Sequence, residues 1–321
     1  MAGGLAIVLG GGGAKGAFQV GVLQALIQRK KVNFETAVGT STGAIQAAAV
    51  AQNDIPALVK FWTDIKGPGD IYRSRGGKLL DILTGKPSLY ATDALQALLK
   101  TAISEQKIRA TGKKLRIRVV NLTTGKAVTV AENADNLAEW VYASCAMPFV
   151  FPPQLSKSAQ GVEEQWVDGG VRDVTPLDEA MLERPRAILV VRAGGPPRPD
   201  QPKKYKSLVD VGLRAVDIQH NEVSENDLKN VQLINNLLTA RDRQLIALRQ
   251  LGLTTVQIDN VMRPFQAEVE RFRLVPVKVI APVEDLYDTL HFDPTDIKRA
   301  IAVGDQLVED MWPELQQFLG V

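Results

Sequence analysis

The sequence predicts a three-layer α/β/α protein with a mostly parallel central sheet and a helical extension at its C-terminal end. A compact apolar run at residues 5–9 is stopped by glycine, which is typical of a strand buried on both faces. Apolar positions then recur at helical spacing over residues 17–28. A short strand at residues 36–39 and an Ala-rich helix at residues 44–51 follow. This order of strand, glycine loop, helix, strand, turn and helix favours a parallel sheet covered by helices.

The later segments continue this alternation. We expect strands at residues 115–122, 128–131, 165–167 and 187–192, and helices at residues 55–65, 92–102 and 137–144. Residues 194–204 contain four prolines and two glycines, which predicts a loop. After it we expect a long helical stretch at residues 207–251 with a break near Asn221, a strand at 274–280, and a helix at 295–318 that the Asp293–Pro294 turn begins. We therefore divide the chain into a core domain at residues 5–195 and a C-terminal region at 196–321 that packs on this core.

Composition excludes several classes of protein. The 321 residues include 38 Lys and Arg against 36 Asp and Glu, a formal net charge of +2, which is too balanced for a dedicated nucleic-acid binder. The single cysteine, Cys145, cannot form an internal disulfide, and two histidines are too few for a His-rich metal site. No apolar run reaches the length of a transmembrane helix, and the N-terminus lacks a signal-peptide pattern, so we expect a cytoplasmic protein.

A G-x-S-x-G pattern lies between a predicted strand and a predicted helix. It consists of Gly39, Thr40, Ser41, Thr42 and Gly43. The small flanking residues permit a sharp, strained turn that presents the serine hydroxyl at the end of the strand. The N-terminus of the following helix favours negative charge at that point. The pattern predicts that Ser41 is a nucleophile.

A glycine-rich loop follows the first predicted strand. It contains Gly11, Gly12, Gly13, Lys15 and Gly16, and without side chains its backbone N–H groups can converge on an anion. One candidate anion is a phosphate, because the spacing also satisfies the G-x-G-x-x-G pattern of dinucleotide folds. The other is the oxyanion of an acyl-transfer intermediate. The loop alone leaves both alternatives open.

The triplet Asp168, Gly169 and Gly170 follows a short predicted strand. A carboxylate at this place could accept the proton of the Ser41 hydroxyl, although an aspartate in a turn is the commoner reason for such a triplet. We interpret His220, in a polar helical stretch, as solvated surface, and His291 as a loop or cap residue. We therefore favour Asp168 over a histidine as the base.

The motifs GGGAKG, GTSTG and DGG, in this order, resemble those of patatin-like phospholipases, which are serine lipid acyl hydrolases with a Ser-Asp dyad. The segment at residues 143–153 is also similar to the family's stretch ahead of its aspartate, and the resemblance spans roughly residues 5–195. It implies that Ser41 is the nucleophile, that Asp168 is the general base and that the loop at residues 11–16 forms the oxyanion hole, with Lys15 where many members carry Arg. The resemblance further implies a lipid or acyl-ester substrate and a reaction that requires neither a cofactor nor a metal.

Two other classes of protein stay open: a nucleotide-binding α/β protein that uses the glycine loop, and a non-catalytic scaffold of the same fold.

A basic cluster could bring the protein into transient contact with a membrane surface, although we favour a solvated loop. It consists of Arg198, Lys203, Lys204 and Lys206. We expect the apolar side chains of the long helical stretch to pack on the core rather than line a lipid cleft: Val231, Ile234, Leu237, Leu238, Leu245 and Leu248. We expect Cys145 to be a buried, inert thiol. The sequence does not indicate an oligomeric state.

Overall fold

The computed structural model describes residues 3–75, 88–158, 160–196, 204–205, 208–270 and 272–321. In these residues a mixed sheet has the strand order β10-β9-β1-β2-β5-β8-β7, with β6 also paired to β5. The strands are β1 (Gly3–Leu9), β2 (Thr36–Thr40), β5 (Lys114–Asn121), β6 (Ala127–Ala131), β7 (Gln154–Lys157), β8 (Glu163–Asp168), β9 (Pro185–Val191) and β10 (Val277–Ile280). A separate pair is formed by β3 (Arg73–Ser74) and β4 (Tyr90–Ala91).

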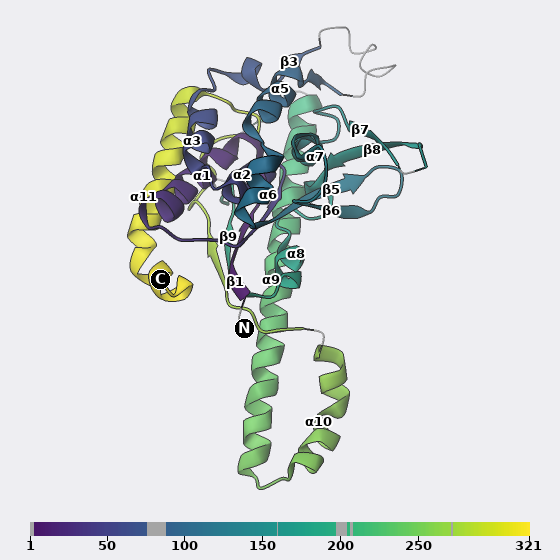
Figure 1. Ribbon diagram of the computed structural model, residues 1–321, viewed down its shortest axis with the longest axis vertical. Coiled ribbons are helices and arrows are strands. Elements are labelled where there is room, and N and C mark those ends of the chain that lie inside the picture. Colours follow the sequence, from purple (N-terminus) through teal and green to yellow (C-terminus); the bar gives the residue numbers. More distant parts are fainter. Residues whose placement is uncertain (1–2, 76–87, 159, 197–203, 206–207, 271) are drawn as a thin grey trace.

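Helices cover both faces of the sheet, so the predicted three-layer α/β/α class is confirmed (Figure 1). They are α1 (Ala17–Leu23), α2 (Thr42–Gln52), α3 (Ile55–Thr63), α5 (Asp93–Ala102), α6 (Glu105–Thr111), α7 (Leu137–Cys145), α8 (Leu177–Leu182), α9 (Leu208–Gln250), α10 (Thr255–Val269) and α11 (Pro294–Leu319). Strand β1 shows the layering. Leu5, Ile7 and Leu9 pack with α1, α2 and α11 on one face, whereas Ala6 and Val8 pack with α8 and α9 on the other. A strand that is apolar at every position is therefore buried on both sides.

The pairing of β5 with two neighbours brings distant parts of the chain together. Strand β2 is parallel to β5, with Thr40 opposite Arg118, and β8 is antiparallel to β5, with Asp168 opposite Val119. Because Arg118 and Val119 are consecutive, the ends of β2 and β8 lie on either side of the same short stretch of β5. The strands thus bring Ser41 and Asp168 near each other across the sheet.

The C-terminal region returns to the sheet and also projects from it. Strand β10 pairs with β9 in parallel, and α11 lies against α1. Helix α9 runs without interruption, so the predicted break near Asn221 is wrong; the segment holds no proline, and its polar residues line a cavity described below. The lower half of α9 and α10 form a hairpin that extends away from the body (Figure 1).

The apolar side chains of α9 divide between the core and this hairpin. Val231 packs in the core between α8 and β9, and Leu238 is also buried. Leu245 and Leu248 pack on α10 instead, so the expectation that these two pack on the core is wrong. Leu237 is 40% exposed, so the expectation that it packs on the core is wrong. Leu237 lies on the outer face of α9, whereas Val231 and Leu238 are buried on its inner face.

Candidate active site

The glycine loop and the serine turn meet at one edge of the sheet. Parallel pairing of β1 and β2 places Leu9 opposite Gly39, so the segments that follow both strands leave the sheet side by side. A methyl group on Gly43 would collide with the carbonyl oxygen of Leu9, so the turn packs directly on the end of β1. Ser41 itself has φ 56° and ψ −130°, a strained conformation for a residue with a side chain. A strained turn at this serine is what the G-x-S-x-G pattern predicts.

A buried hydroxyl holds the strained turn. The backbone N–H of Ser41 donates to Oγ of Ser144 (2.8 Å), and Oγ of Ser144 donates to the carbonyl oxygen of Arg118 (2.7 Å). Ser144 lies on α7 and is completely buried. Two backbone groups that would otherwise be buried without partners are thereby satisfied by one side chain. Ser144 lies in the family-like segment at residues 143–153, but nothing in the sequence assigned this serine a role of its own.

Asp168 is completely buried at the end of β8. Its Oδ1 accepts a hydrogen bond from the N–H of Gly170 (2.7 Å), whereas its Oδ2 has no partner in the described part of the chain. The Ser41 hydroxyl is near enough to lower the pKa of Asp168, but no contact between the two meets the distance and angle of a hydrogen bond. We therefore describe the pair as adjacent, with an open carboxylate oxygen.

The surroundings make this carboxylate more basic than usual. Burial raises the pKa of Asp168, and His220, the Ser41 hydroxyl and the Gly170 N–H each act to lower it. A raised pKa suits a group that must accept a proton from a hydroxyl.

The neighbouring Cys145 is buried, and burial together with the charge of Asp168 raises the pKa of its thiol well above its ordinary value. It has the character of the inert thiol expected from the sequence.

Backbone bonding distinguishes among the glycines of the loop. The N–H of Gly11 donates to the carbonyl oxygen of Val174, and the N–H of Lys15 donates to that of Gly12. Gly16 closes a short 3₁₀ turn, Gly13–Gly16. Within the described ranges, the N–H groups of Gly12 and Gly13 have no acceptor. These two are therefore the donors that remain available for an anion.

An apolar cavity opens beside Ser41 and Gly13. Its walls come from α2, α3, α5, α7 and the segment before α11, and they are almost entirely hydrophobic: Ile45, Phe61, Trp62, Ile65, Ile71, Leu95, Met147, Phe151, Leu290 and Phe292, with Thr42 and Cys145. Such a lining suits a hydrocarbon chain.

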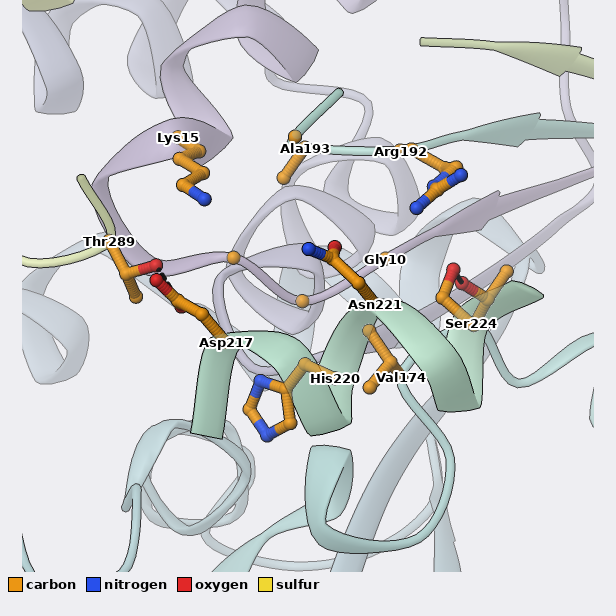
Figure 2. Close-up of a pocket in the computed structure, with 14 residues that line it drawn as sticks. Gly10, Lys15, Val174, Arg192, Ala193, Asp217, His220, Asn221, Ser224 and Thr289 are labelled. Atoms are coloured by element: carbon orange, nitrogen blue, oxygen red, sulfur yellow. Dashed lines mark hydrogen bonds between the residues drawn. The ribbon is translucent and has the colours of Figure 1, made fainter. Parts of the chain in front are cut away.

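A second, polar cavity lies along residues 10–12 (Figure 2). Lys15 and Arg192 approach it from one side, while Asp217 and Asn221 of α9 approach it from the other, and His220 of α9 also contributes to its lining. Lys15 pairs with Asp285 (2.9 Å), and Asp217 accepts from Thr289 (2.6 Å). The backbone N–H of Arg192 donates to the carbonyl oxygen of Ile280, whereas its half-buried guanidinium has no hydrogen bond or ion pair to any described residue.

The interpretation of His220 as solvated surface is wrong. The side chain is half-buried, lines the polar cavity and lies beside Gly170. The signal that could have found it is its spacing from Val216, Ser224 and Val231, which places all four on one stripe of α9. His291 is exposed in a loop and bonds to Asp296 (2.8 Å), which agrees with its expected place.

Three further expectations concern binding partners. Arg198, Lys203 and Lys206 of the basic cluster lie outside the described residues, and Lys204 is exposed. In the residues that the structure describes, no group of three or more His, Cys, Asp or Glu side chains could hold a metal ion, and no helix is long and apolar enough to span a membrane. A dinucleotide site requires an acidic residue at the end of the second strand, but β2 ends in Thr40 and Glu35 precedes it.

Comparison with known proteins defines the class. The model of the patatin-like phospholipase family matches residues 7–181, more than half of the chain, and the chain belongs to this family. The uncharacterized protein YqhO of Bacillus subtilis is 29% identical over 216 residues, which cover 61% of this chain and 73% of that protein. The uncharacterized protein YjjU of Escherichia coli is 24% identical over 235 residues, which cover 70% of this chain and 63% of that protein. Among solved structures, VipD from Legionella pneumophila aligns with a TM-score of 0.45 and 16% identity over 98% of this chain and 67% of that chain.

Proposed function

We propose that this chain is a serine-dependent lipid acyl hydrolase of the phospholipase A, lysophospholipase or esterase type. The observation that carries the proposal is the convergence at one point of a strained serine, a buried carboxylate with an open oxygen, two unbonded backbone N–H groups and an apolar cavity. Each is a part that acyl transfer to a serine needs. Membership in the patatin-like phospholipase family supports a lipid substrate.

The mechanism follows from the positions of these groups. Asp168 takes the proton of the Ser41 hydroxyl, and the serine oxygen attacks the ester carbonyl carbon. The N–H groups of Gly12 and Gly13 stabilise the resulting oxyanion. When the intermediate collapses, the C–O bond to the alcohol breaks and Asp168 returns the proton to the departing alcohol. Water, deprotonated by Asp168, then attacks the acyl-enzyme, which releases the carboxylic acid and restores Ser41.

The two cavities divide the substrate between them. The apolar cavity beside Ser41 takes the acyl chain, and the polar cavity takes the alcohol part, with Arg192 as the cation available for an anionic headgroup. In this proposal the catalytic domain of residues 5–195 supplies Ser41, Asp168 and the glycine loop, and α9 closes the polar cavity. We expect the enzyme to act in the cytoplasm, with transient contact at a membrane surface.

The test compares the parent chain with Ser41→Ala and Asp168→Asn on a panel of phospholipids, lysophospholipids and neutral esters, with products identified by mass spectrometry. We expect both variants to stay folded, Ser41→Ala to lose hydrolysis and fluorophosphonate labelling completely, and Asp168→Asn to lose roughly 10²- to 10⁴-fold in rate. Asp135→Asn, whose side chain is 90% exposed, is the matched control and should keep full activity. Full activity in Ser41→Ala would overturn the proposal.

A further inference from the structure

Helix α9 places an imidazole over the buried carboxylate. A methyl group on Gly170 would lie 3.1 Å from Oδ1 of Asp168 and 3.2 Å from both Nε2 and Cε1 of His220. Both side chains therefore border the space that a side chain at position 170 would fill. They are thus within the ~6 Å over which a charge alters the protonation of a neighbour.

The charged groups around His220 leave it free to act on Asp168. In the described part of the chain neither ring nitrogen of His220 has a hydrogen-bond partner. Asp217, one turn earlier on α9, is bonded to Thr289, and Lys15 across the cavity is paired with Asp285. Arg192 also faces this cavity.

Asp168 has few other neighbours that could hold its charge. The Ser41 hydroxyl and the Gly170 N–H are neutral donors, and the nearby Cys145 thiol offers no positive charge. Among the influences that lower the pKa of Asp168, the charge of His220 is the largest. Burial acts in the opposite direction, so the carboxylate depends on this partner to stay ionised.

We propose that His220 is a positioning residue whose protonated imidazole keeps the Asp168 carboxylate in its anionic, proton-accepting state. The inference rests on the proposed role of Asp168 as the base. It adds to the Ser41–Asp168 pair a third residue that contacts neither the serine nor the substrate carbonyl. This support matters most toward acid pH, where Asp168 would otherwise take up a proton.

The experiment is the pH profile of kcat/KM for ester hydrolysis by the full chain, from about pH 4.5 to pH 8.5. In His220→Gln, which removes the charge, we expect the midpoint of the acid limb to move upward by about 1–2 pH units. In His220→Lys, which keeps a positive charge, we expect it to return at least half-way toward the parent value. His291→Gln is the matched control, since the only other histidine is exposed in a loop, and its profile should coincide with that of the parent.

The outcomes separate this inference from the proposed function. If the parent hydrolyses esters but His220→Gln lowers the rate equally at every pH, with an unchanged midpoint, His220 has a structural role only and the inference is wrong. If the parent neither hydrolyses esters nor labels with a fluorophosphonate, the proposed function fails instead. Titration of the ¹³C carboxyl signal that disappears in Asp168→Asn then tests the electrostatic link directly. It should still show an upward shift in His220→Gln, and an unchanged titration would refute the link.

Discussion

The hydroxyl of Ser144 offers a direct test of how the elbow is held. In Ser144→Ala the N–H of Ser41 and the carbonyl oxygen of Arg118 both lose their partner in a site with no solvent exposure. An unsatisfied buried polar group costs about 1–3 kcal/mol, so the variant should lose about 2–6 kcal/mol of unfolding free energy. Urea unfolding followed by tryptophan fluorescence measures this loss. Ser104→Ala, which removes a helix-capping hydroxyl nearer the surface, should cost only about 1 kcal/mol.

The same variant should affect the reactivity of Ser41. The strained backbone of Ser41 is no longer anchored to α7, so its hydroxyl moves relative to Gly12, Gly13 and Asp168. A misplacement on the order of 1 Å can cost about 10²-fold in rate, and we expect fluorophosphonate labelling to slow by at least about 10-fold. A loss of stability below about 0.5 kcal/mol, with labelling at the parent rate, would refute the view that this hydroxyl holds the elbow.

Three other changes test separate parts of the structure. Gly43→Ala places a methyl group against the carbonyl oxygen of Leu9 and should lower both urea stability, by about 1–3 kcal/mol, and labelling, whereas Gly69→Ala, with open space around it, should change neither. Arg192→Gln should raise KM about 10- to 100-fold for an ester with an anionic headgroup and leave KM for an uncharged ester unchanged. Burial raises the pKa of Asp227 to about 7, so Asp227→Asn should stabilise the fold by about 1–2 kcal/mol above pH 7, where the half-buried carboxylate is charged.

Specific results would contradict the predictions for Asp227→Asn and Arg192→Gln. The gain in Asp227→Asn should fade as the pH falls from about 7 toward the ordinary value of 3.8, because the folded carboxyl is then protonated and the unfolded chain progressively takes up the same proton. A gain of equal size throughout this range would show that the charge of Asp227 is not its cause. Equal KM changes for charged and uncharged esters in Arg192→Gln would remove the assignment of the polar cavity to an anionic headgroup.

Local patterns predicted the fold well where the pattern is itself the cause of the structure. Strand β1 is apolar at successive positions because both of its faces are covered, and the elbow is rich in small residues because it packs on the end of β1. The short α10 was missed because only three of its residues are buried: Ile258, Met262 and Val269. The break in α9 was expected from polarity near Asn221, which instead reflects a polar cavity.

The candidate site was predictable only in part, because some of its residues meet through contacts that are distant in the sequence. Ser41 and the glycine loop occupy a recognisable turn, and Asp168 stands beside two glycines, but the hydrogen bonds of Ser144 and the place of His220 beside Gly170 arise only when α7 and α9 pack on the sheet. No local pattern specifies this packing. The pairing of Lys15 with Asp285, 270 residues later, is a similar long-range contact, and it leaves the Arg192 guanidinium in the polar cavity without a side-chain partner among the described residues.

The pairing of β5 with β2 and β8 determines which insertions and substitutions this protein should tolerate. The separation of Ser41 and Asp168 is set by the register of three strands, in which Thr40 and Asp168 oppose adjacent residues of β5, and not by the length of the chain between them. Extra residues in an exposed connection such as the turn at Gly125 should therefore leave the chemistry intact, because surface loops accept insertions readily. A slip of β5 by one residue would instead turn its inward side chains outward and disrupt both partners at once. Sequence variation in this protein should thus accumulate in the exposed connections between β2, β5 and β8, while these strands themselves change little.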